Sequence, residues 1–136
     1  STGKIHMSRE RDPENIPHAK HGVDIVLECS GKFNNRNASA GHLAAGAKKV
    51  LVSAPCKNAD KTIVFGVNHT ELTADANVVS NASCTTNCLA PIAKALADTV
   101  GIEAGYMTTI HAYTGDQPTL DSSHKDLRRA RAAECR

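Results

Sequence analysis

Residues 23–55 read VDIVLECSGKFNNRNASAGHLAAGAKKVLVSAP. The apolar, β-branched run at 23–27 ends at a Ser-Gly pair and is typical of a buried strand. Residues 38–47 are rich in alanine and stop near a glycine, which predicts a short helix. Residues 49–53 repeat the strand pattern and end before a proline. A strand, a helix and a second strand at this spacing predict a βαβ unit, and therefore a parallel sheet.

The sequence on the C-terminal side of this unit continues the pattern. Residues 62–67 and 77–80 predict two further strands. Residues 87–100 carry apolar side chains at a helical period, which predicts a helix with Pro91 in its first turn or at a kink. Residues 105–111 predict another strand, and a polar loop follows. The predicted fold class is therefore α/β.

The composition narrows the classes of function. The 136 residues are 40% apolar and 3% aromatic, with a formal net charge of +2. So few aromatic side chains disfavour a single-stranded nucleic-acid platform, which needs ring faces for stacking. No apolar run approaches the roughly 18 residues of a membrane helix, and no signal peptide is visible. We expect neither a membrane nor a required nucleic-acid partner.

Cysteine usage points to a reducing compartment. The number of cysteines is odd, and no CxxC pair occurs; the five are Cys29, Cys56, Cys84, Cys88 and Cys135. A disulfide framework is therefore disfavoured, and we expect a cytoplasmic protein. Because the sequence opens without Met, we also expect a partial chain.

Small residues stand where the first two predicted strands end. Ser30 and Gly31 follow one strand, and Ser53 and Ala54 follow the other. In an open α/β sheet, ligands bind beyond the carboxyl ends of the strands. These residues would let a flat ligand lie against that edge of the sheet.

The stretch SNASCTTNCLAP, residues 80–91, places Cys84 between a strand and a helix. The N–H groups and positive partial charge of a helix N-terminus favour thiolate over thiol, and the thiolate is the nucleophile. The same N–H groups, with hydroxyls from Ser83 and Thr85, could hold an oxyanion or a phosphate. The alternative is that Cys84 and Cys88 are inert packing residues.

A nucleophilic thiolate needs a base or cation beside it, and His111 at the end of a predicted strand is the candidate. We expect the remaining histidines at the surface. A zinc site of Cys84, Cys88, His111 and His124 is disfavoured, because Cys-x3-Cys spacing suits structural zinc poorly. We therefore predict no metal site.

A basic stretch with Arg128, Arg129 and Arg131 follows Thr114. It is either a solvated run of charge or a recognition site for a substrate phosphate, to which the guanidinium geometry is suited. The residues alone leave both possibilities open.

Several segments together resemble the glyceraldehyde-3-phosphate dehydrogenase family. The resemblance runs from about residue 3 to residue 133. The segments that carry it are, in order, VDIVLECSGKF, AGAKKVLVSAP, FGVN, SNASCTTNCLAP and GYMTTIHAYTGDQPTLDSSHKDLRRARAA. The resemblance implies that residues 1–82 are the C-terminal half of a Rossmann-like parallel-sheet domain. Residues 83–136 would then begin an α+β catalytic domain of a homotetramer. The glycine-rich GxGxxG fingerprint is absent from the chain, and in the family it lies upstream.

The resemblance also implies a role for each matching residue. Cys84 would attack the aldehyde of glyceraldehyde 3-phosphate, and His111 would act as the base. Ser83 and Thr85 would bind the attacking inorganic phosphate, and Thr114 and Arg129 the substrate phosphate. The cofactor, NAD or NADP, would lie against the strand-end residues Ser30, Gly31, Ser53 and Ala54.

Two positions depart from the commonest family pattern. Gly115 stands where many bacterial members have an Asn that orients the nicotinamide amide. Ser122 and Ser123 stand where strictly NAD-dependent members often carry Leu-Pro, which crowds a ribose 2′-phosphate. Two serines could instead donate hydrogen bonds to that phosphate, so we expect tolerance of NADP.

Three rival interpretations remain. Erythrose-4-phosphate dehydrogenase is a sister family with the same Cys and His, and it uses water instead of phosphate. A Cys–His hydrolase would need no dinucleotide, and the βαβ pattern argues against it. The third is that the 136 residues alone are inactive and not stably folded, because strand edges and apolar faces would be exposed.

Overall fold

The computed structural model describes residues 3–115 and residue 123. The chain divides into two compact units, with the division between Ile102 and Glu103. Each unit is described by itself. The described part of the second unit contains no helix or strand. All helices and strands that the structure describes therefore belong to the first unit.

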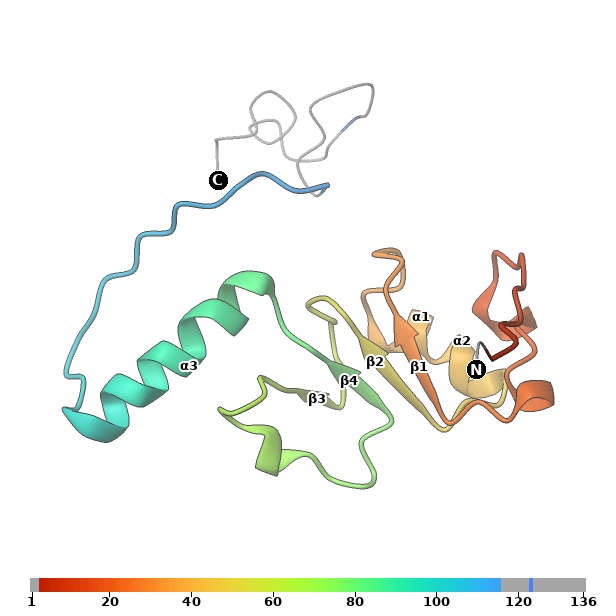
Figure 1. Cartoon of the computed structure of the whole chain (residues 1–136), viewed down its shortest axis with the longest axis horizontal. Coiled ribbons are helices and arrows are strands. Elements are labelled where there is room, and N and C mark those ends of the chain that lie inside the picture. The colour runs from red at the N-terminus through yellow and green to blue at the C-terminus, as the bar shows by residue number, and fades with distance from the viewer. Residues whose placement is uncertain (1–2, 116–122, 124–136) are drawn as a thin grey trace. The chain divides into compact units, whose positions relative to one another are not determined.

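The first unit is built on a four-stranded sheet (Figure 1). Its strands are β1 (Ile25–Glu28), β2 (Lys49–Val52), β3 (Lys61–Thr62) and β4 (Val78–Ser80), in the spatial order β1-β2-β4-β3. Every neighbouring pair is parallel. The α/β fold class and the parallel sheet predicted from the sequence are confirmed.

Two short helices, α1 (Arg36–Ser39) and α2 (Gly41–Ala44), connect β1 to β2. Asn35 caps α1, because its side-chain oxygen accepts the N–H of Ala38 at 2.9 Å. Leu43 of α2 packs against a core cluster of buried residues in which β2 contributes Val50 and Val52. Short 3-10 helices occupy Pro13–Asn15, Ala19–His21 and His69–Glu71.

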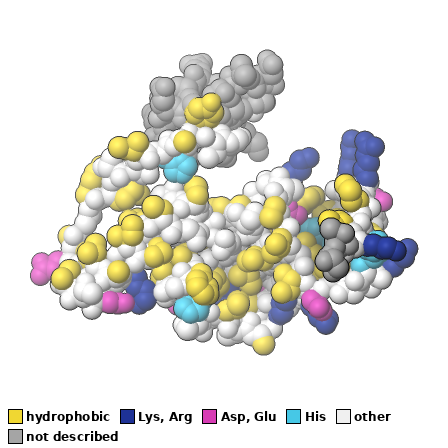
Figure 2. Space-filling view, in the orientation of Figure 1, with side chains coloured by type: hydrophobic (Ala, Val, Ile, Leu, Met, Phe, Trp, Pro, Cys, Tyr) yellow, Lys and Arg dark blue, Asp and Glu magenta, His cyan; other side chains and the backbone are white. Residues whose placement is uncertain are grey.

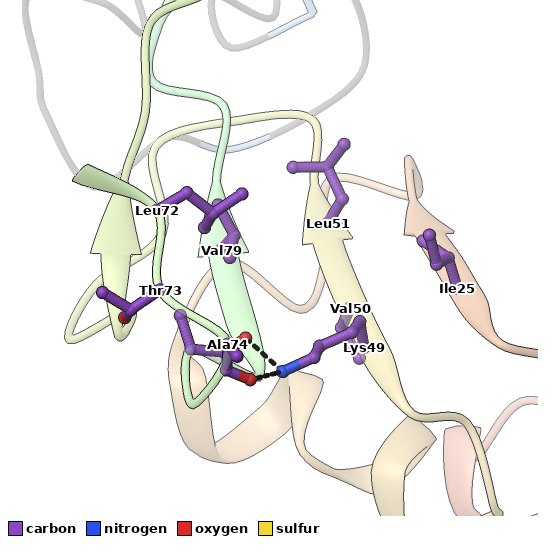
Figure 3. A pocket seen from close by; sticks show the side chains of 9 residues that line it. Ile25, Lys49, Val50, Leu51, Leu72, Thr73, Ala74 and Val79 are labelled. Carbon is purple, nitrogen blue, oxygen red and sulfur yellow. Dashed lines mark hydrogen bonds between the residues drawn. The ribbon is translucent and has the colours of Figure 1, made fainter. Parts of the chain in front are cut away.

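The other face of the sheet is only partly covered. Ile25 and Leu27 of β1 are 61% and 64% exposed, and Figure 2 shows hydrophobic side chains at the surface of this view. A hollow of about 420 Å³ lies here, lined by Ile25, Leu51, Leu72 and Val79 among others (Figure 3). At its edge the ammonium group of Lys49 donates to the carbonyl oxygens of Ala74 and Ala76 and to Asn77 Oδ1.

The longest helix, α3 (Cys84–Thr99), follows β4 and runs away from the sheet (Figure 1). None of its residues is buried. Leu89, Ile92 and Leu96 are 41%, 57% and 49% exposed and form an apolar stripe at helical spacing. Pro91 lies inside the helix, in its second turn.

Four sequence predictions need correction. The helix expected at 38–47 is two shorter ones, and the helix expected at 87–100 begins three residues earlier, at Cys84. The strand expected at 62–67 stops at Thr62, because the chain turns: Asn68 accepts the N–H of Val64 and donates to the carbonyl of Thr62. Residues 105–111 form no strand.

Candidate active site

The chain turns sharply between β4 and α3, and this turn places Cys84. Asn81 continues the sheet, since its N–H donates to the carbonyl of Val52 at 2.9 Å. Ala82 is buried and has a left-handed backbone, with φ of 58°. Ser83 is extended again and is the N-cap of α3. Cys84 is therefore the first residue of the helix.

The first turn of α3 is held by side chains. Ser83 Oγ accepts the N–H of Thr86 at 3.0 Å and lies 2.7 Å from Thr86 Oγ1. The side-chain amide of Asn87 donates to the carbonyl of Asn81 at 2.7 Å and to that of Ser83 at 2.9 Å. The bond from Thr86 satisfies one of the N–H groups that a helix start otherwise leaves open. The bonds from Asn87 tie the helix to the turn before it, so the beginning of the helix is well defined.

Cys84 is exposed, and so is Cys88 one turn further along the helix. The burial that the packing-residue alternative requires is therefore absent at both positions. Among the four cysteines that the structure describes, the buried one is Cys56, at 8% exposure, and burial raises the pKa of its thiol. At the N-terminus of a 16-residue helix, Cys84 has the location that favours a thiolate.

A second hollow, also of about 420 Å³, adjoins this turn. On one side it is lined by Pro55, Cys56 and Lys57 of the loop after β2. On the other side it is lined by Ala82, Ser83 and Thr86, among other residues. The start of α3 and the loop after β2 therefore face a shared space, whose mostly apolar wall carries the side chains of Ser83 and Thr86.

The predicted cofactor residues lie at the carboxyl ends of two neighbouring strands. Ser30 and Gly31 follow β1, Ser53 and Ala54 follow β2, and Ala54 alone of the four is partly covered. Gly31 has φ of 75°, and a Cβ built there would meet no atom within 4 Å. Small, exposed side chains and open space fit a dinucleotide laid across this edge.

The turn at Ser30 is tied to the core by residues that the sequence analysis did not identify. Glu28 is 6% exposed, and its Oε1 accepts the N–H of Ser30 at 2.7 Å. Its Oε2 lies 2.9 Å from Nε2 of His42, and Nδ1 of His42 lies 3.0 Å from Nε2 of His18. Burial raises the pKa of Glu28, but the bonds from Ser30 and His42 outweigh it and lower the pKa overall.

The expectation that His42 lies at the surface is wrong, since it is 4% exposed. Its alanine-rich helix gave no sign of which face would be covered. The sequence feature that could have revealed a buried histidine is Glu28 at the end of an apolar strand. A buried carboxylate requires a hydrogen-bonding partner, and a histidine can be that partner. Burial, and then the neighbouring His42, lower the pKa of His18.

His111 and Thr114 belong to the second unit, and Cys84 and Thr85 to the first. Nδ1 of His111 lies 2.5 Å from the carbonyl oxygen of Ala112. A carbonyl oxygen only accepts, so this contact is a hydrogen bond in the tautomer that carries a proton on Nδ1. The pairing of Cys84 with His111 stays a prediction.

Other predicted residues fall outside the described part of the chain, namely Arg128, Arg129, Arg131, Ser122 and His124. Ser123 is described and exposed, and Gly115 is exposed as well. Over residues 3–115 and 123, no three metal-binding side chains converge. Within those same residues, no helix is both long and apolar enough to cross a membrane.

Comparison with known proteins agrees with the resemblance seen in the sequence. Residues 83–136 match the family model "Glyceraldehyde 3-phosphate dehydrogenase, C-terminal domain". Proteins named glyceraldehyde-3-phosphate dehydrogenase from Xanthobacter flavus and Cereibacter sphaeroides are 66% and 63% identical to this chain. One from Geobacillus stearothermophilus is 59% identical. Each comparison spans 131 residues, which is 96% of this chain and 39% of the relative. The chain thus spans about two fifths of these relatives, and over that length it matches the glyceraldehyde-3-phosphate dehydrogenase family.

Proposed function

We propose that these residues serve a phosphorylating glyceraldehyde-3-phosphate dehydrogenase. The enzyme would oxidise glyceraldehyde 3-phosphate, with NAD or NADP and inorganic phosphate, to 1,3-bisphosphoglycerate. The observation that carries the proposal is Cys84, an exposed thiol at the first residue of a long helix with a hydroxyl N-cap beside it. The names of the relatives support the same activity.

The covalent steps use this chain's own residues. His111 takes the proton of the Cys84 thiol. The thiolate forms a C–S bond to the aldehyde carbon as the C=O π bond breaks, and the oxygen receives that proton from His111, giving a thiohemiacetal. His111 takes the hydroxyl proton as the substrate carbon loses a hydride, and a thioester results. The oxygen of inorganic phosphate then attacks the thioester carbon, the C–S bond breaks, and Cys84 leaves as thiolate. When bound, the oxidised nicotinamide supplies the hydride acceptor.

Phosphate recognition is assigned to two groups of residues. Ser83 and Thr85 border the start of α3, where hydroxyls and a helix N-terminus suit the attacking phosphate. Thr114 and Arg129 are assigned to the phosphate of the substrate, by resemblance. Ser30, Gly31, Ser53 and Ala54 would hold the dinucleotide, with Ser122 and Ser123 next to a ribose 2′-phosphate.

A phosphate-dependence assay tests this function. The complete enzyme that carries these 136 residues is supplied with glyceraldehyde 3-phosphate and NAD, and reduced cofactor is followed by absorbance. We expect steady turnover with phosphate and a single stoichiometric burst without it. Undiminished turnover of erythrose 4-phosphate without phosphate would instead identify the sister activity, in which water cleaves the thioester.

The same assay with NADP tests the serine pair. Ser122 and Ser123 provide hydroxyls where crowding residues would exclude a 2′-phosphate. We expect kcat/KM with NADP to be above about a thousandth of that with NAD, a gap of about 4 kcal/mol. A lower ratio would refute the serine argument.

We infer further that the complete enzyme is a cytoplasmic homotetramer. The odd number of cysteines supports a reducing compartment. The exposed apolar stripe of α3 and the open sheet face support burial against further protein. Without such cover we expect the 136 residues alone to be inactive.

A further inference from the structure

Ser80, the last residue of β4, is fully buried at 0% exposure. Its Oγ donates to the carbonyl oxygen of Ala54 at 2.9 Å. It accepts the N–H groups of Cys56 and Ala82, both at 3.1 Å. A serine hydroxyl has one donor and two acceptor sites. All three are used here, each by a backbone group.

These three bonds join two parts of the candidate site. Ala54 and Cys56 belong to the loop after β2, against which the dinucleotide is proposed to lie. Ala82 belongs to the turn that leads to Cys84 two residues later. One oxygen atom therefore links the cofactor loop to the turn before the nucleophile.

The turn at Ala82 needs such support. Its φ of 58° is in the left-handed region, which an alanine adopts only at an energetic cost. Strained backbone of this kind persists where the surroundings over-determine it. Burial of Ala82 at 6% exposure and the bond from its N–H to Ser80 are the two restraints on the residue itself.

We infer that Ser80 is a positioning residue for the nucleophile: its hydroxyl fixes the turn that presents Cys84 at the helix start and sets that turn against the cofactor loop. The inference rests on the proposed function. It adds a residue that acts through the backbone and touches neither substrate nor cofactor.

Removing the hydroxyl has a predictable consequence. In Ser80→Ala, the N–H groups of Cys56 and Ala82 lose their acceptor in a buried place, which the chain relieves by moving those segments. The left-handed turn then relaxes and the first turn of α3 frays. Cys84 loses the aligned N–H groups that favour its thiolate, so its apparent pKa rises toward the unperturbed value of about 8.5.

The test is the pH dependence of alkylation at Cys84, measured by iodoacetamide labelling and peptide mass spectrometry on the complete enzyme. Cys88, on the same helix, serves as the internal reference. The matched control is Ser39→Ala. Ser39 is also 0% exposed. Its Oγ donates to the carbonyl of Phe33 at 2.6 Å, and its side chain also hydrogen-bonds Cys56 of the cofactor loop, so this control perturbs that loop while leaving the bond from Ala82 to Ser80 in place.

We expect Ser80→Ala to lower the ratio of Cys84 to Cys88 alkylation rates at pH 7 about tenfold from its wild-type value. The cause is a rise of about one unit in the pKa of the Cys84 thiol. Ser39→Ala should leave that ratio within about twofold of wild type, although it also empties a buried hydroxyl site. Equal ratios in the two variants would overturn the role of Ser80 and leave the proposed function standing. An unperturbed Cys84 pKa in the wild type would overturn both.

If Ser80→Ala does not fold, Ser80→Cys provides the second test. A buried thiol fills the space but is a weak donor and a weak acceptor. The labelling ratio of Cys84 to Cys88 should fall in the same direction, with labelling at residue 80 resolved by its own peptide. A wild-type ratio in a folded Ser80→Cys protein would overturn the inference.

Discussion

Glu28 and His42 meet inside the first unit, with Oε2 of the carboxylate 2.9 Å from Nε2 of the imidazole. Their side chains are only 5% and 6% exposed. The other carboxylate oxygen holds the N–H of Ser30. A buried pair of this kind connects the core to the turn where the cofactor is proposed to bind.

Replacing His42 by Ala should destabilise the first unit by roughly 3 kcal/mol, because a buried carboxylate loses its partner. Lys94→Ala is the control. It removes an exposed pair with Asp98, which should contribute less than about 0.5 kcal/mol. Urea unfolding of both variants measures the difference, and equal losses would contradict the structural role given to the buried pair.

Asp60 should make the stability fall in acid. The Arg36 guanidinium, 2.6 Å away, and the N–H groups of Val78 and Asn77 lower the pKa of Asp60 from 3.8 to about 2. The folded pKa lies below the unfolded one, so the stabilisation is complete above pH 3.8 and is lost as the pH falls toward 2. Urea midpoints between about pH 5 and 2 measure this fall.

Asp60→Asn should flatten the decline over that interval, because the amide does not titrate. Asp98→Asn, at an exposed position, should leave it in place. A decline in Asp60→Asn as steep as in the wild type would show that other carboxylates cause it.

Two glycines with positive φ should respond differently to alanine. At Gly46, φ is 102°, and an added Cβ would lie 2.6 Å from Cβ of Ala19. At Gly22, φ is 62° and the added atom meets nothing within 4 Å. We expect Gly46→Ala to cost roughly 2 to 4 kcal/mol and Gly22→Ala about 1 kcal/mol. Thermal unfolding of the two variants measures both losses of stability. A loss in Gly22→Ala as large as that in Gly46→Ala would refute the clash with Ala19.

Ser83 has two separable roles, cap and phosphate ligand. Ser83→Ala should destabilise α3 by about 1 kcal/mol, and Ser83→Asp should restore most of this, since Asp is also a good N-cap. The carboxylate should nevertheless repel inorganic phosphate, so the KM for phosphate should rise in Ser83→Asp although stability recovers. A Ser83→Asp enzyme with wild-type KM for phosphate would remove Ser83 from the phosphate site.

The sequence predicted the parts of the fold that depend on local patterns. Continuous apolar runs at β1 and β2 identified parallel strands, and small residues after them identified the sheet edge. The expectation that the first of these strands is buried is wrong, since Ile25 and Leu27 are 61% and 64% exposed on the uncovered face of the sheet. The run at 62–67 was misleading because it contains Phe65, which is 80% exposed, and Gly66 with φ of 82°. There the side-chain amide of Asn68, six residues after Thr62, donates to the carbonyl of Thr62 in place of a neighbouring strand. A pattern of apolar residues cannot predict such a side-chain hydrogen bond.

The candidate site was predictable only in part, for a similar reason. A cysteine between a strand and a helix could be identified from local sequence. Two other features depend on which segments meet in space. They are the buried pair of Glu28 and His42 and the Ser80 hydroxyl with its three backbone hydrogen bonds. Serine and glutamate are usually exposed and histidine is intermediate, so their burial was not expected without the tertiary structure.

The central claim, covalent catalysis by Cys84, is tested most directly by trapping the acyl-enzyme. The complete enzyme is mixed with glyceraldehyde 3-phosphate and NAD without inorganic phosphate, quenched in acid and mapped by peptide mass spectrometry. We expect one 3-phosphoglyceroyl group per subunit, on Cys84, which disappears when phosphate is added and never forms in Cys84→Ser. An acyl group on Cys88, or turnover in Cys84→Ser, would contradict it.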